Sequence, residues 1–485
     1  MLKKISILLI SYMLVLGLIS IHASAEVDSS TIQRLDQSVK KIVYEKMPNA
    51  EVSIAIRDDF GNVIYDFNGN RQQKPASNMK LLTSAAALTE LGENYRFRTN
   101  IYTTGYVKKG TLHGDLYLQG TGDPTLTVDD LDQFASFLAD QGIKKIDGRI
   151  IGDDFWFDQD LLTPDIKKDD ESYYYAAPIT ALTLSPDSDY DSGTVIIEAL
   201  GEIIGEKPRL KTTPELGELV IKNEAKTVAT NQNTTLKIER EYRKNKVVVS
   251  GNLPIHKSWK EWITVPNPTL HTVLLFIHAL EKHNVQYTQE QLFRGKTPTS
   301  ATLMVQKQSI PLAQIIIPYM KLSNNSIADI LVKTMGKVRV DQGSTKAGLR
   351  VVKQYALSRH LNMDDWFFED GSGMSHNNSV SSIDLTKLLY SVQKEKQWYS
   401  TFFNSLPVAA NSDRMIGGSL KNRLKSPFTE GRVFAKTGAI DGVNTLSGYL
   451  IGNSGMPYSF SILVQNQNGT IPAIDEIVEK MAEEL

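Results

Sequence analysis

The hydrophobic pattern of this chain is most regular in the stretch that follows Pro75. Apolar side chains occupy almost every side of the helix predicted there, at Met79, Leu81, Leu82, Ala85, Ala86, Ala87, Leu88 and Leu91. A helix that is apolar nearly all round belongs in a protein interior. A second helix is predicted at residues 327–333, and both are expected to pack against a sheet.

Runs of β-branched and aromatic residues predict the strands of that sheet. Five candidate strands lie towards the two ends of the chain, at residues 52–56, 63–65, 433–435, 445–450 and 459–464. The first two would form a hairpin around the turn sequence Asp58-Asp59-Phe60-Gly61. The pattern therefore predicts an α/β fold in which a sheet lies between layers of helix.

The buried helix begins with a serine and a lysine, in the string Ser77-Asn78-Met79-Lys80. Residues three apart lie on one face of a helix, so the Lys80 amine can reach the Ser77 hydroxyl. Burial disfavours the charged ammonium and lowers the lysine pKa from its usual value of about 10.4. A neutral Lys80 can take the proton of Ser77 as this hydroxyl attacks a carbonyl, so the pair predicts a covalent acyl-transfer site.

The same S-x-x-K spacing occurs twice more, at Ser38–Lys41 and at Ser391–Lys394. Neither of these pairs opens an apolar helix, and exposed polar residues on a surface helix explain both. Ser77 is therefore the candidate nucleophile.

Two further strings supply the remaining groups of such a site. Ser323-Asn324-Asn325 offers a second hydroxyl and an amide, and Lys436-Thr437-Gly438 offers a cation at the end of a predicted strand. Such a strand can present backbone N–H groups to a developing oxyanion, and Gly438 removes a side chain where substrate approaches the backbone. Lys436 and Thr437 are expected to bind a substrate carboxylate. Short strings are weak signals singly, so their order along the chain carries the prediction.

With these three strings the chain resembles the low-molecular-mass penicillin-binding proteins. Within them it is similar to the D-alanyl-D-alanine carboxypeptidase and endopeptidase subgroup, which has a large insertion between the S-x-x-K and S-x-N motifs. Further shared strings are Gly122-Asp123-Pro124-Thr125-Leu126, Lys321-Leu322, Asp370-Gly371-Ser372-Gly373 and Ser405-Leu406-Pro407-Val408-Ala409. Asn324 is a departure, because the wider superfamily often has Asp at that position.

The resemblance implies a serine transpeptidase or β-lactamase-like domain, an antiparallel sheet flanked by helices, with inserted β-rich domains. It implies a serine DD-peptidase that cleaves D-alanyl-D-alanine or cross-link bonds of peptidoglycan stem peptides through an acyl-enzyme and is acylated by β-lactams. Ser77 would be the nucleophile and Lys80 the base, and the N–H groups of Ser77 and Ala439 would form the oxyanion hole. Ser323 would pass a proton towards the leaving nitrogen, and Asn325 would orient the substrate amide and Lys80.

An acidic cluster, Asp169-Asp170-Glu171, runs into the string Tyr173-Tyr174-Tyr175. Because Asp and Glu side chains are mostly exposed in folded proteins, a solvated loop is the simplest interpretation of this cluster. The resembled subgroup places an acid just before such a tyrosine-rich string, where it meets the free end of the stem peptide's side chain. The resemblance therefore implies that Asp170 binds substrate, with Asp169 and Glu171 as its substitutes.

The spacing of the strings predicts the domain organisation. The interval from Ser77 to Ser323 is more than twice as long as the interval from Ser323 to Lys436, so a separate module is expected in the first. Strand-like runs at residues 101–104, 115–118 and 245–250 agree with β structure there. The predicted division is a signal peptide at 1–25, a catalytic domain at 26–96 and 300–485, and an inserted region at 97–299 with two β-rich subdomains.

Composition and the two chain ends favour an exported globular enzyme. The chain has 485 residues, too many for one core, with 41% hydrophobic and 22% charged residues. Lys3-Lys4, the apolar stretch 5–21 and Ala23-Ser24-Ala25 are typical of a secretion signal, with an uncleaved anchor as the alternative. The acidic helix expected at 474–485 lacks the basic face of a membrane-surface helix. We expect an extracellular or wall-associated protein without a stable membrane anchor.

Several function classes are disfavoured by what the chain lacks. It has no cysteine, which excludes a disulfide framework and a thiolate nucleophile. A net charge of −2 without a basic patch argues against a nucleic-acid partner. No H-E-x-x-H string occurs, which argues against a zinc peptidase. We expect no metal and no cofactor. His376 is expected to be a loop residue at the cleft edge, and Asp153-Asp154-Phe155-Trp156 a solvated turn beside a buried tryptophan.

Two rival functions remain. A β-lactamase would use the same strings but hydrolyse β-lactams rapidly, and the long insertion argues against that class. A catalytically silent wall-binding protein would share the fold, although each catalytic position is intact in this chain.

Overall fold

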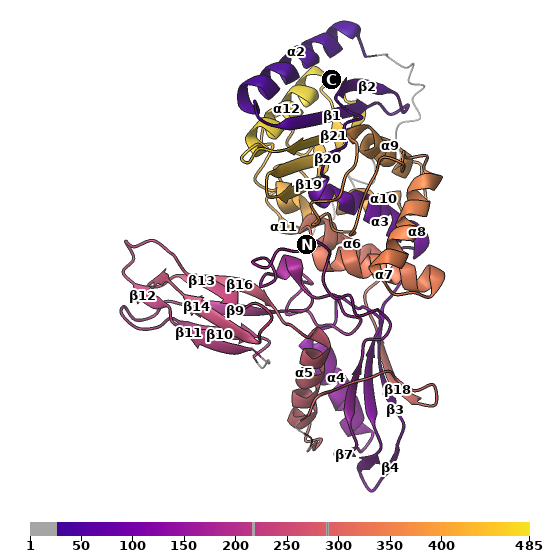
Figure 1. Ribbon diagram of the computed structural model, residues 1–485, viewed down its shortest axis with the longest axis vertical. Coiled ribbons are helices and arrows are strands. Elements are labelled where there is room, and N and C mark those ends of the chain that lie inside the picture. The colour runs from indigo at the N-terminus through magenta and orange to yellow at the C-terminus, as the bar shows by residue number, and fades with distance from the viewer. Residues whose placement is uncertain (1–26, 216–218, 288, 290) are drawn as a thin grey trace, which may run out of the picture.

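The computed structural model describes residues 27–215, 219–287, 289 and 291–485. It shows a main domain from which two modules project in different directions (Figure 1). The predicted signal peptide at 1–25 lies outside the described residues. Within the described ranges, no helix is long and apolar enough to cross a membrane.

The main domain is built on a five-stranded antiparallel sheet in the order β19-β20-β21-β1-β2. Its strands are β1 (Glu51–Arg57), β2 (Val63–Phe67), β19 (Val433–Ile440), β20 (Val443–Ile451) and β21 (Pro457–Gln465). All five predicted strands are confirmed, and β1 and β2 form the expected hairpin. Because β1 pairs with β21, the two ends of the described chain meet in one sheet.

Helices cover both faces of this sheet. One face packs on the first and last helices of the domain, and the other packs on the helices that carry the serine strings. The helices are α2 (Ser29–Lys46), α3 (Met79–Glu90), α6 (Leu312–Lys321), α7 (Asn325–Val340), α8 (Thr345–Ser358), α9 (Ser382–Val392), α10 (Tyr399–Ser405), α11 (Arg414–Gly417) and α12 (Ile471–Glu484). Every residue of α3 from Met79 to Leu88 is buried, as its all-round apolar pattern predicts.

The first inserted module combines two sheets with two helices. A five-stranded sheet has the order β17-β8-β6-β3-β18, and a small sheet has the order β4-β5-β7. Its elements are β3 (Arg98–Thr103), β4 (Tyr106–Lys108), β5 (Thr111–His113), β6 (Leu116–Gly120), α4 (Val128–Asp140), β7 (Lys145–Asp147), β8 (Ile150–Asp153), α5 (Pro268–Lys282), β17 (Phe293–Arg294) and β18 (Thr302–Gln308). The module is mixed α/β, whereas the sequence indicated mainly β structure.

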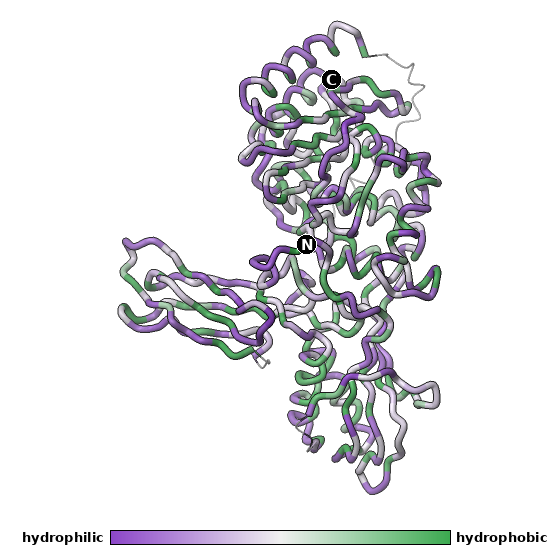
Figure 2. Tube along the Cα trace, viewed as in Figure 1, coloured by the Kyte–Doolittle hydropathy of each residue, from purple (hydrophilic) through white to green (hydrophobic). Residues whose placement is uncertain are grey.

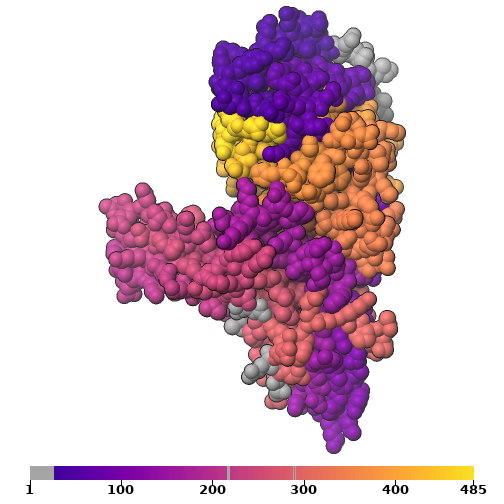
Figure 3. Space-filling model, viewed as in Figure 1, coloured from indigo at the N-terminus to yellow at the C-terminus, as the bar shows by residue number. Residues whose placement is uncertain are grey.

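The second inserted module is built from strands alone and extends sideways as a separate arm (Figures 1 and 3). Its strands are β9 (Thr194–Leu200), β10 (Arg209–Thr213), β11 (Val220–Asn223), β12 (Lys226–Val228), β13 (Lys237–Arg240), β14 (Lys246–Ser250), β15 (Asn252–Pro254) and β16 (Ser258–Thr264). Buried residues alternate with more exposed ones along β13 and β14, and Figure 2 shows polar and apolar positions interleaved in this arm. The arm has its own small hydrophobic core.

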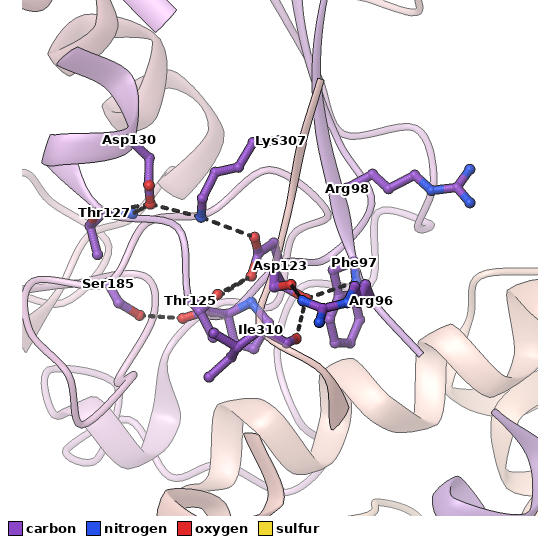
Figure 4. A network of polar contacts seen from close by, with 12 residues as sticks. Arg96, Phe97, Arg98, Asp123, Thr125, Thr127, Asp130, Ser185, Lys307 and Ile310 are labelled. Carbon is purple, nitrogen blue, oxygen red and sulfur yellow. Dashed lines mark hydrogen bonds and ion pairs between the residues drawn. The ribbon is translucent and has the colours of Figure 1, made fainter. Parts of the chain in front are cut away.

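The two chain crossings between the main domain and the first module lie side by side (Figure 4). The Phe97 backbone N–H donates to Ser309 Oγ at 3.0 Å, and Arg96 donates to the Ser309 carbonyl at 2.6 Å. Strand β18 pairs with β3, so residues 302–308 belong to the inserted sheet. The boundary predicted at residue 300 therefore falls before a strand of the inserted module, and we propose that the catalytic part resumes at Ser309.

A buried carboxylate, Asp123, organises the loop after β6 at this junction (Figure 4). Its Oδ1 accepts hydrogen bonds from the Thr125 backbone N–H at 2.8 Å and from the Thr125 hydroxyl at 2.7 Å. Lys307 of β18 lies 3.7 Å from Asp123 Oδ2 and 2.8 Å from Asp130. The G-D-P-T-L string thus forms a hydrogen-bonded loop at the base of the inserted region.

The prediction of a solvated turn at residues 153–156 is wrong. Asp153 and Asp154 are both 2% exposed, whereas Phe155 is exposed. Asp154 forms an ion pair with Arg294 at 2.6 Å and accepts a hydrogen bond from the Thr269 hydroxyl at 2.6 Å. The acid is buried because a cation distant in sequence compensates its charge, which no local pattern reveals.

Candidate active site

The Ser77 hydroxyl lies on a short turn, η1 (Ala76–Asn78), that leads directly into α3. Ala76 has a positive φ of 45°, an uncommon backbone conformation for a residue other than glycine. The Asn78 side-chain amide donates to the Lys436 carbonyl at 2.8 Å and fastens the turn to β19. The helix that carries Lys80 and the strand that carries K-T-G therefore meet at Ser77.

Two glycines allow this close approach. A Cβ at Gly438 would lie 2.2 Å from the Thr445 hydroxyl and 2.9 Å from the Ser77 nitrogen, and a Cβ at Gly373 would lie 1.8 Å from the Ala76 carbonyl oxygen. The sequence suggested that Gly438 makes room for substrate. The structure adds a packing requirement, because only glycine lets β19 lie this close to Thr445 and the Ser77 turn.

Lys80 is completely buried and lies at the centre of the site. Its Nζ donates to Ser77 Oγ at 2.8 Å, to Asn325 Oδ1 at 2.7 Å and to the Ser372 carbonyl at 2.8 Å. The S-x-x-K and S-N-N strings are thus joined through one amine. The i, i+3 spacing predicted the contact with Ser77, but not the two other acceptors.

Burial lowers the pKa of Lys80 to about 7, and the negative charges of Asp370 and Asp329 oppose this shift. A substantial fraction of the amine is therefore neutral near pH 7. A neutral amine has a lone pair directed at one of its partners, so it can accept the proton of the Ser77 hydroxyl. This is the protonation state that nucleophilic attack by Ser77 requires.

Ser323 lines the cleft and lies directly beside the buried Lys436. The Lys436 ammonium donates to Ser323 Oγ at 2.8 Å, which leaves the Ser323 proton free to point towards a ligand. Burial lowers the pKa of Lys436, and the charge of Lys80 adds to this. A substrate carboxylate beside Lys436 would favour the charged form again. The order of the three strings predicted this convergence, although none of these contacts is local.

Asn324, where the wider superfamily often has Asp, is held by the inserted region. Its Nδ2 donates to the Tyr190 carbonyl at 2.9 Å and to Asp191 Oδ1 at 2.8 Å, while its Oδ1 accepts from the Ile327 backbone N–H and caps α7. Burial raises the pKa of Asp191 to about 8. An aspartate at 324 would offer no donor to these two acceptors, which gives a physical reason for the amide.

The K-T-G string lies inside a strand and not at its end, because β19 continues to Ile440. This corrects the prediction of a strand end at Lys436. Strand β19 is the edge strand of the main sheet. Near its start the Ala435 N–H donates to the Pro407 carbonyl at 3.0 Å, and among the described residues no strand pairs with the rest of this edge. Free N–H groups along such an edge can bind a substrate carbonyl. The Thr437 hydroxyl is exposed and contacts the Ser419 hydroxyl at 2.7 Å.

A cleft of about 440 Å³ collects most of the predicted site residues, with Ser77, Ser323, Asn325, Ala439 and Asp170 in its lining. Lys80 and Lys436 lie beneath its floor and reach it through their hydrogen bonds. A larger hollow of about 910 Å³ lies beside α4 and α5 of the first module and contains none of the three strings.

The cleft also distinguishes between the three acids of the Asp169–Glu171 cluster. Asp170 lines it and accepts a hydrogen bond from the Tyr175 hydroxyl at 2.9 Å. Asp169 is exposed and does not line it, and Glu171 lines a different hollow. The Tyr175 carbonyl in turn accepts from the Asn325 side-chain amide at 3.0 Å. The inserted segment that contains Asp170 is therefore fastened directly to the S-N-N string.

Sequence reasoning missed several residues of the cleft, namely Asp165, Lys167, Met374, Ile440 and Asp441. Lys167 and Asp441 come within 3.8 Å of each other across the opening. Lys167 is close in sequence to Asp170, and Asp441 is close to Ala439. This closeness was the only indication in the sequence that the two residues line the cleft. His376 lines the same cleft, as expected for a loop histidine at its edge.

The two other S-x-x-K pairs lie outside the cleft. Ser38 and Lys41 are on α2, which packs on the opposite face of the sheet. Ser391 donates to the Leu388 carbonyl, and Lys394 lies 4.4 Å from the centre of the Tyr390 ring. Among the residues that the structure describes, no cluster of three or more His, Asp and Glu side chains has the arrangement of a metal site.

Comparison with known proteins agrees with the geometry. The profile of the D-Ala-D-Ala carboxypeptidase 3 (S13) family matches residues 33–484. The D-alanyl-D-alanine carboxypeptidase of Actinomadura sp. (strain R39) is 33% identical over 469 residues, which cover 95% of this chain and 87% of that protein. The D-alanyl-D-alanine carboxypeptidase DacB of Haemophilus influenzae is 24% identical over 84% of this chain.

The fold comparison gives the same result. The crystal structure of penicillin binding protein 4 (dacB) from Haemophilus influenzae matches with a TM-score of 0.78 at 22% identity and covers 91% of this chain and 97% of that one. The predicted resemblance and the predicted β-lactamase-like fold are confirmed. Because the family profile spans almost the whole described chain, the chain belongs to the D-Ala-D-Ala carboxypeptidase 3 (S13) family.

Proposed function

We propose that this protein is a serine DD-peptidase that cleaves D-alanyl-D-alanine or cross-link bonds of peptidoglycan stem peptides. The observation that carries the proposal is the buried Lys80 amine 2.8 Å from the Ser77 hydroxyl and 2.7 Å from Asn325. A depressed lysine pKa beside a cleft serine is the arrangement that activates a hydroxyl without histidine. Relatives named as D-alanyl-D-alanine carboxypeptidases support the choice of bond.

The first half of the reaction forms an acyl-enzyme. Ser77 Oγ attacks the carbonyl of the penultimate D-alanine while Lys80 takes its proton, and the N–H groups of Ser77 and Ala439 bind the oxyanion. The C–N bond then breaks, and the proton that Lys80 took from Ser77 passes through the Ser323 hydroxyl to the leaving amine, so Lys80 is neutral and Ser323 protonated again before water enters. Asn325 orients the substrate amide as well as Lys80, to which it is bonded.

The K-T-G string lies on the side of the cleft where the leaving group binds. Lys436 and Thr437 bind the carboxylate of the terminal residue, and Gly438 keeps β19 close to the Ser77 turn. Water attacks the ester in the second half, the Ser77–acyl bond breaks, and the proton of water restores the Ser77 hydroxyl through Lys80. No cofactor takes part. A β-lactam imitates the substrate and leaves a slowly hydrolysed ester on Ser77.

The decisive experiment is mass spectrometry of products from purified muropeptides. Loss of a single D-alanine from pentapeptide shows carboxypeptidase activity, and conversion of cross-linked dimers to monomers shows endopeptidase activity. Rapid turnover of nitrocefin with neither product would identify a β-lactamase instead. No product together with no covalent penicillin adduct would favour a non-catalytic wall-binding protein.

We further propose that Asp170 binds a cationic group at the end of the side chain of the stem peptide's third residue. Tyr174 and Tyr175 line the cleft with their ring centres 5.5 Å apart in an edge-to-face arrangement, and they provide an apolar wall for the stem of such a side chain. Asp170 at the end of this wall then meets the ammonium group.

Asp170→Asn should lower kcat/KM roughly 5- to 150-fold on peptides with a free amine at that position, because one charge contact of about 1–3 kcal/mol is lost. The loss should disappear when the amine is acetylated. Asp169→Asn is the matched control, since Asp169 is exposed outside the cleft and should behave like the parent. Equal hydrolysis of both peptides by Asp170→Asn would remove Asp170 from the site.

Export follows from the proposed substrate. Residues 1–25 carry the features of a cleaved secretion signal, and peptidoglycan lies outside the cytoplasmic membrane. We propose that the mature protein is extracellular or wall-associated. Its other partners are then β-lactams, where these are present.

A further inference from the structure

Asp329 is a buried carboxylate that the proposed mechanism leaves without a role. It lies on α7, one helical turn after Asn325, and is 3% exposed. Among the described residues, no lysine or arginine forms an ion pair with it. Lys333, one turn further along α7, pairs with Asp158 at 2.6 Å instead. A buried acid without such a partner is costly, so its surroundings need an explanation.

Two neutral hydrogen bonds hold the Asp329 side chain. Its Oδ1 accepts from the Gly371 backbone N–H at 2.9 Å, and its Oδ2 accepts from the Thr163 hydroxyl at 2.7 Å. Ser372 follows Gly371 in the chain, and its carbonyl accepts a hydrogen bond from the Lys80 amine at 2.8 Å. Asp329 therefore fixes the turn that offers one of the three acceptors to Lys80.

A second buried carboxylate, Asp370, begins the same turn. It is fully buried and accepts from the backbone N–H groups of Ser372 at 2.9 Å and Ser375 at 2.7 Å. Neither carboxylate touches Lys80, but both charges act on its amine across the protein interior. In such an environment Coulombic interactions are much stronger than in water.

The ionisable groups around Lys80 have pKa values that are shifted in different directions. Burial and the charge of Asp370 raise the pKa of Asp329, whereas burial lowers the pKa of Lys80. Burial holds the pKa of Tyr319, which both acids also face, well above its usual range. On the other side of Lys80, burial lowers the pKa of Lys436. The pKa shifts of Lys80 and Asp329 therefore run in opposite directions, and the charge of each group favours the charged form of the other.

We propose that Asp329 is a positioning residue that sets the proportion of neutral Lys80, through its negative charge and through the Gly371–Ser372 turn. This inference rests on the proposed function, because it assumes that Lys80 is the base for Ser77. A charged Asp329 stabilises the ammonium form of Lys80 and so restrains acylation near neutral pH. Its removal should release a larger share of the neutral base.

The test is the pH dependence of the second-order acylation rate with a penicillin, followed by intact-mass spectrometry, in Asp329→Asn. The asparagine oxygen can accept from Gly371 and its amide can donate to the Thr163 oxygen, so both hydrogen bonds are retained. The midpoint of the acidic limb should move to lower pH, and the rate near pH 7 should rise by up to about twofold, because about half of the Lys80 amine is already neutral there in the parent. A merely structural role would lower the rate at every pH and leave the midpoint in place.

Two further variants distinguish an effect of the Asp329 charge from a folding defect. Thr163→Val keeps the carboxylate but removes a hydrogen bond that favours its charged form, so the midpoint should move in the same direction by a smaller amount. Asp158→Asn neutralises the partner of Lys333 and should leave the midpoint unchanged. A midpoint that stays fixed or rises in Asp329→Asn and Thr163→Val would overturn the role of Asp329. If the parent itself is not acylated, the proposed function fails and not this inference alone.

Discussion

Ser77→Ala is expected to abolish covalent labelling by penicillin and to lower kcat on stem peptides by roughly 10⁶-fold, the size of loss seen when a nucleophilic serine is removed. The reason is that, in the proposed mechanism, Ser77 Oγ carries the acyl group, and this atom lies 2.8 Å from the Lys80 amine. Lys80 keeps its bonds to Asn325 and Ser372 in this variant, so the fold should persist. Intact-mass spectrometry after incubation with penicillin measures the adduct directly.

The controls are Ser38→Ala and Ser391→Ala, which have the same S-x-x-K spacing but lie outside the cleft. Both should be labelled like the parent. Peptide mapping should place the adduct on the segment that contains Ser77. Label that survives in Ser77→Ala, or that maps to Ser38 or Ser391, would be incompatible with the assigned nucleophile.

Lys80→Arg should slow acylation by about 10²- to 10⁴-fold, the usual contribution of a general base. Arginine keeps the positive charge and can donate to Asn325 and Ser372, but it does not give up its proton near neutral pH. The variant therefore separates the charge of Lys80 from its function as a base. Stopped-flow acylation with a chromogenic β-lactam measures the rate, and thermal unfolding checks the fold.

The pH profile of the parent enzyme should also show that the acylation rate depends on a neutral Lys80 amine. Because the pKa of Lys80 is lowered to about 7, acylation should reach a plateau above this pH and decline below it as the amine gains a proton. Lys41→Arg and Lys394→Arg, at the other S-x-x-K strings, should not change this profile. Unchanged acylation in Lys80→Arg, or a rate independent of pH down to pH 5, would remove Lys80 from the mechanism.

Local sequence determined the parts of this site that depend on neighbouring residues. The i, i+3 spacing placed Lys80 beside Ser77, and the apolar pattern around it predicted a buried α3. The strands of the main sheet were predictable for the same reason, because β-branched and aromatic runs indicate them without knowledge of their partners. The order of the three strings indicated one acyl-transfer site, which the family match supports.

Only the tertiary structure decided which distant groups surround these parts. Asn325 reaches Lys80, Lys436 reaches Ser323 and Asp191 accepts from Asn324, and each pair is far apart in the chain. The tertiary structure likewise decided which charged side chains are buried. Asp154 looked like part of a solvated turn until Arg294 was found beside it, and Asp329 had no local signal at all. The physical reason is that the free energy of a buried charge depends on its desolvation and on partners that packing brings together, and a local sequence pattern specifies neither.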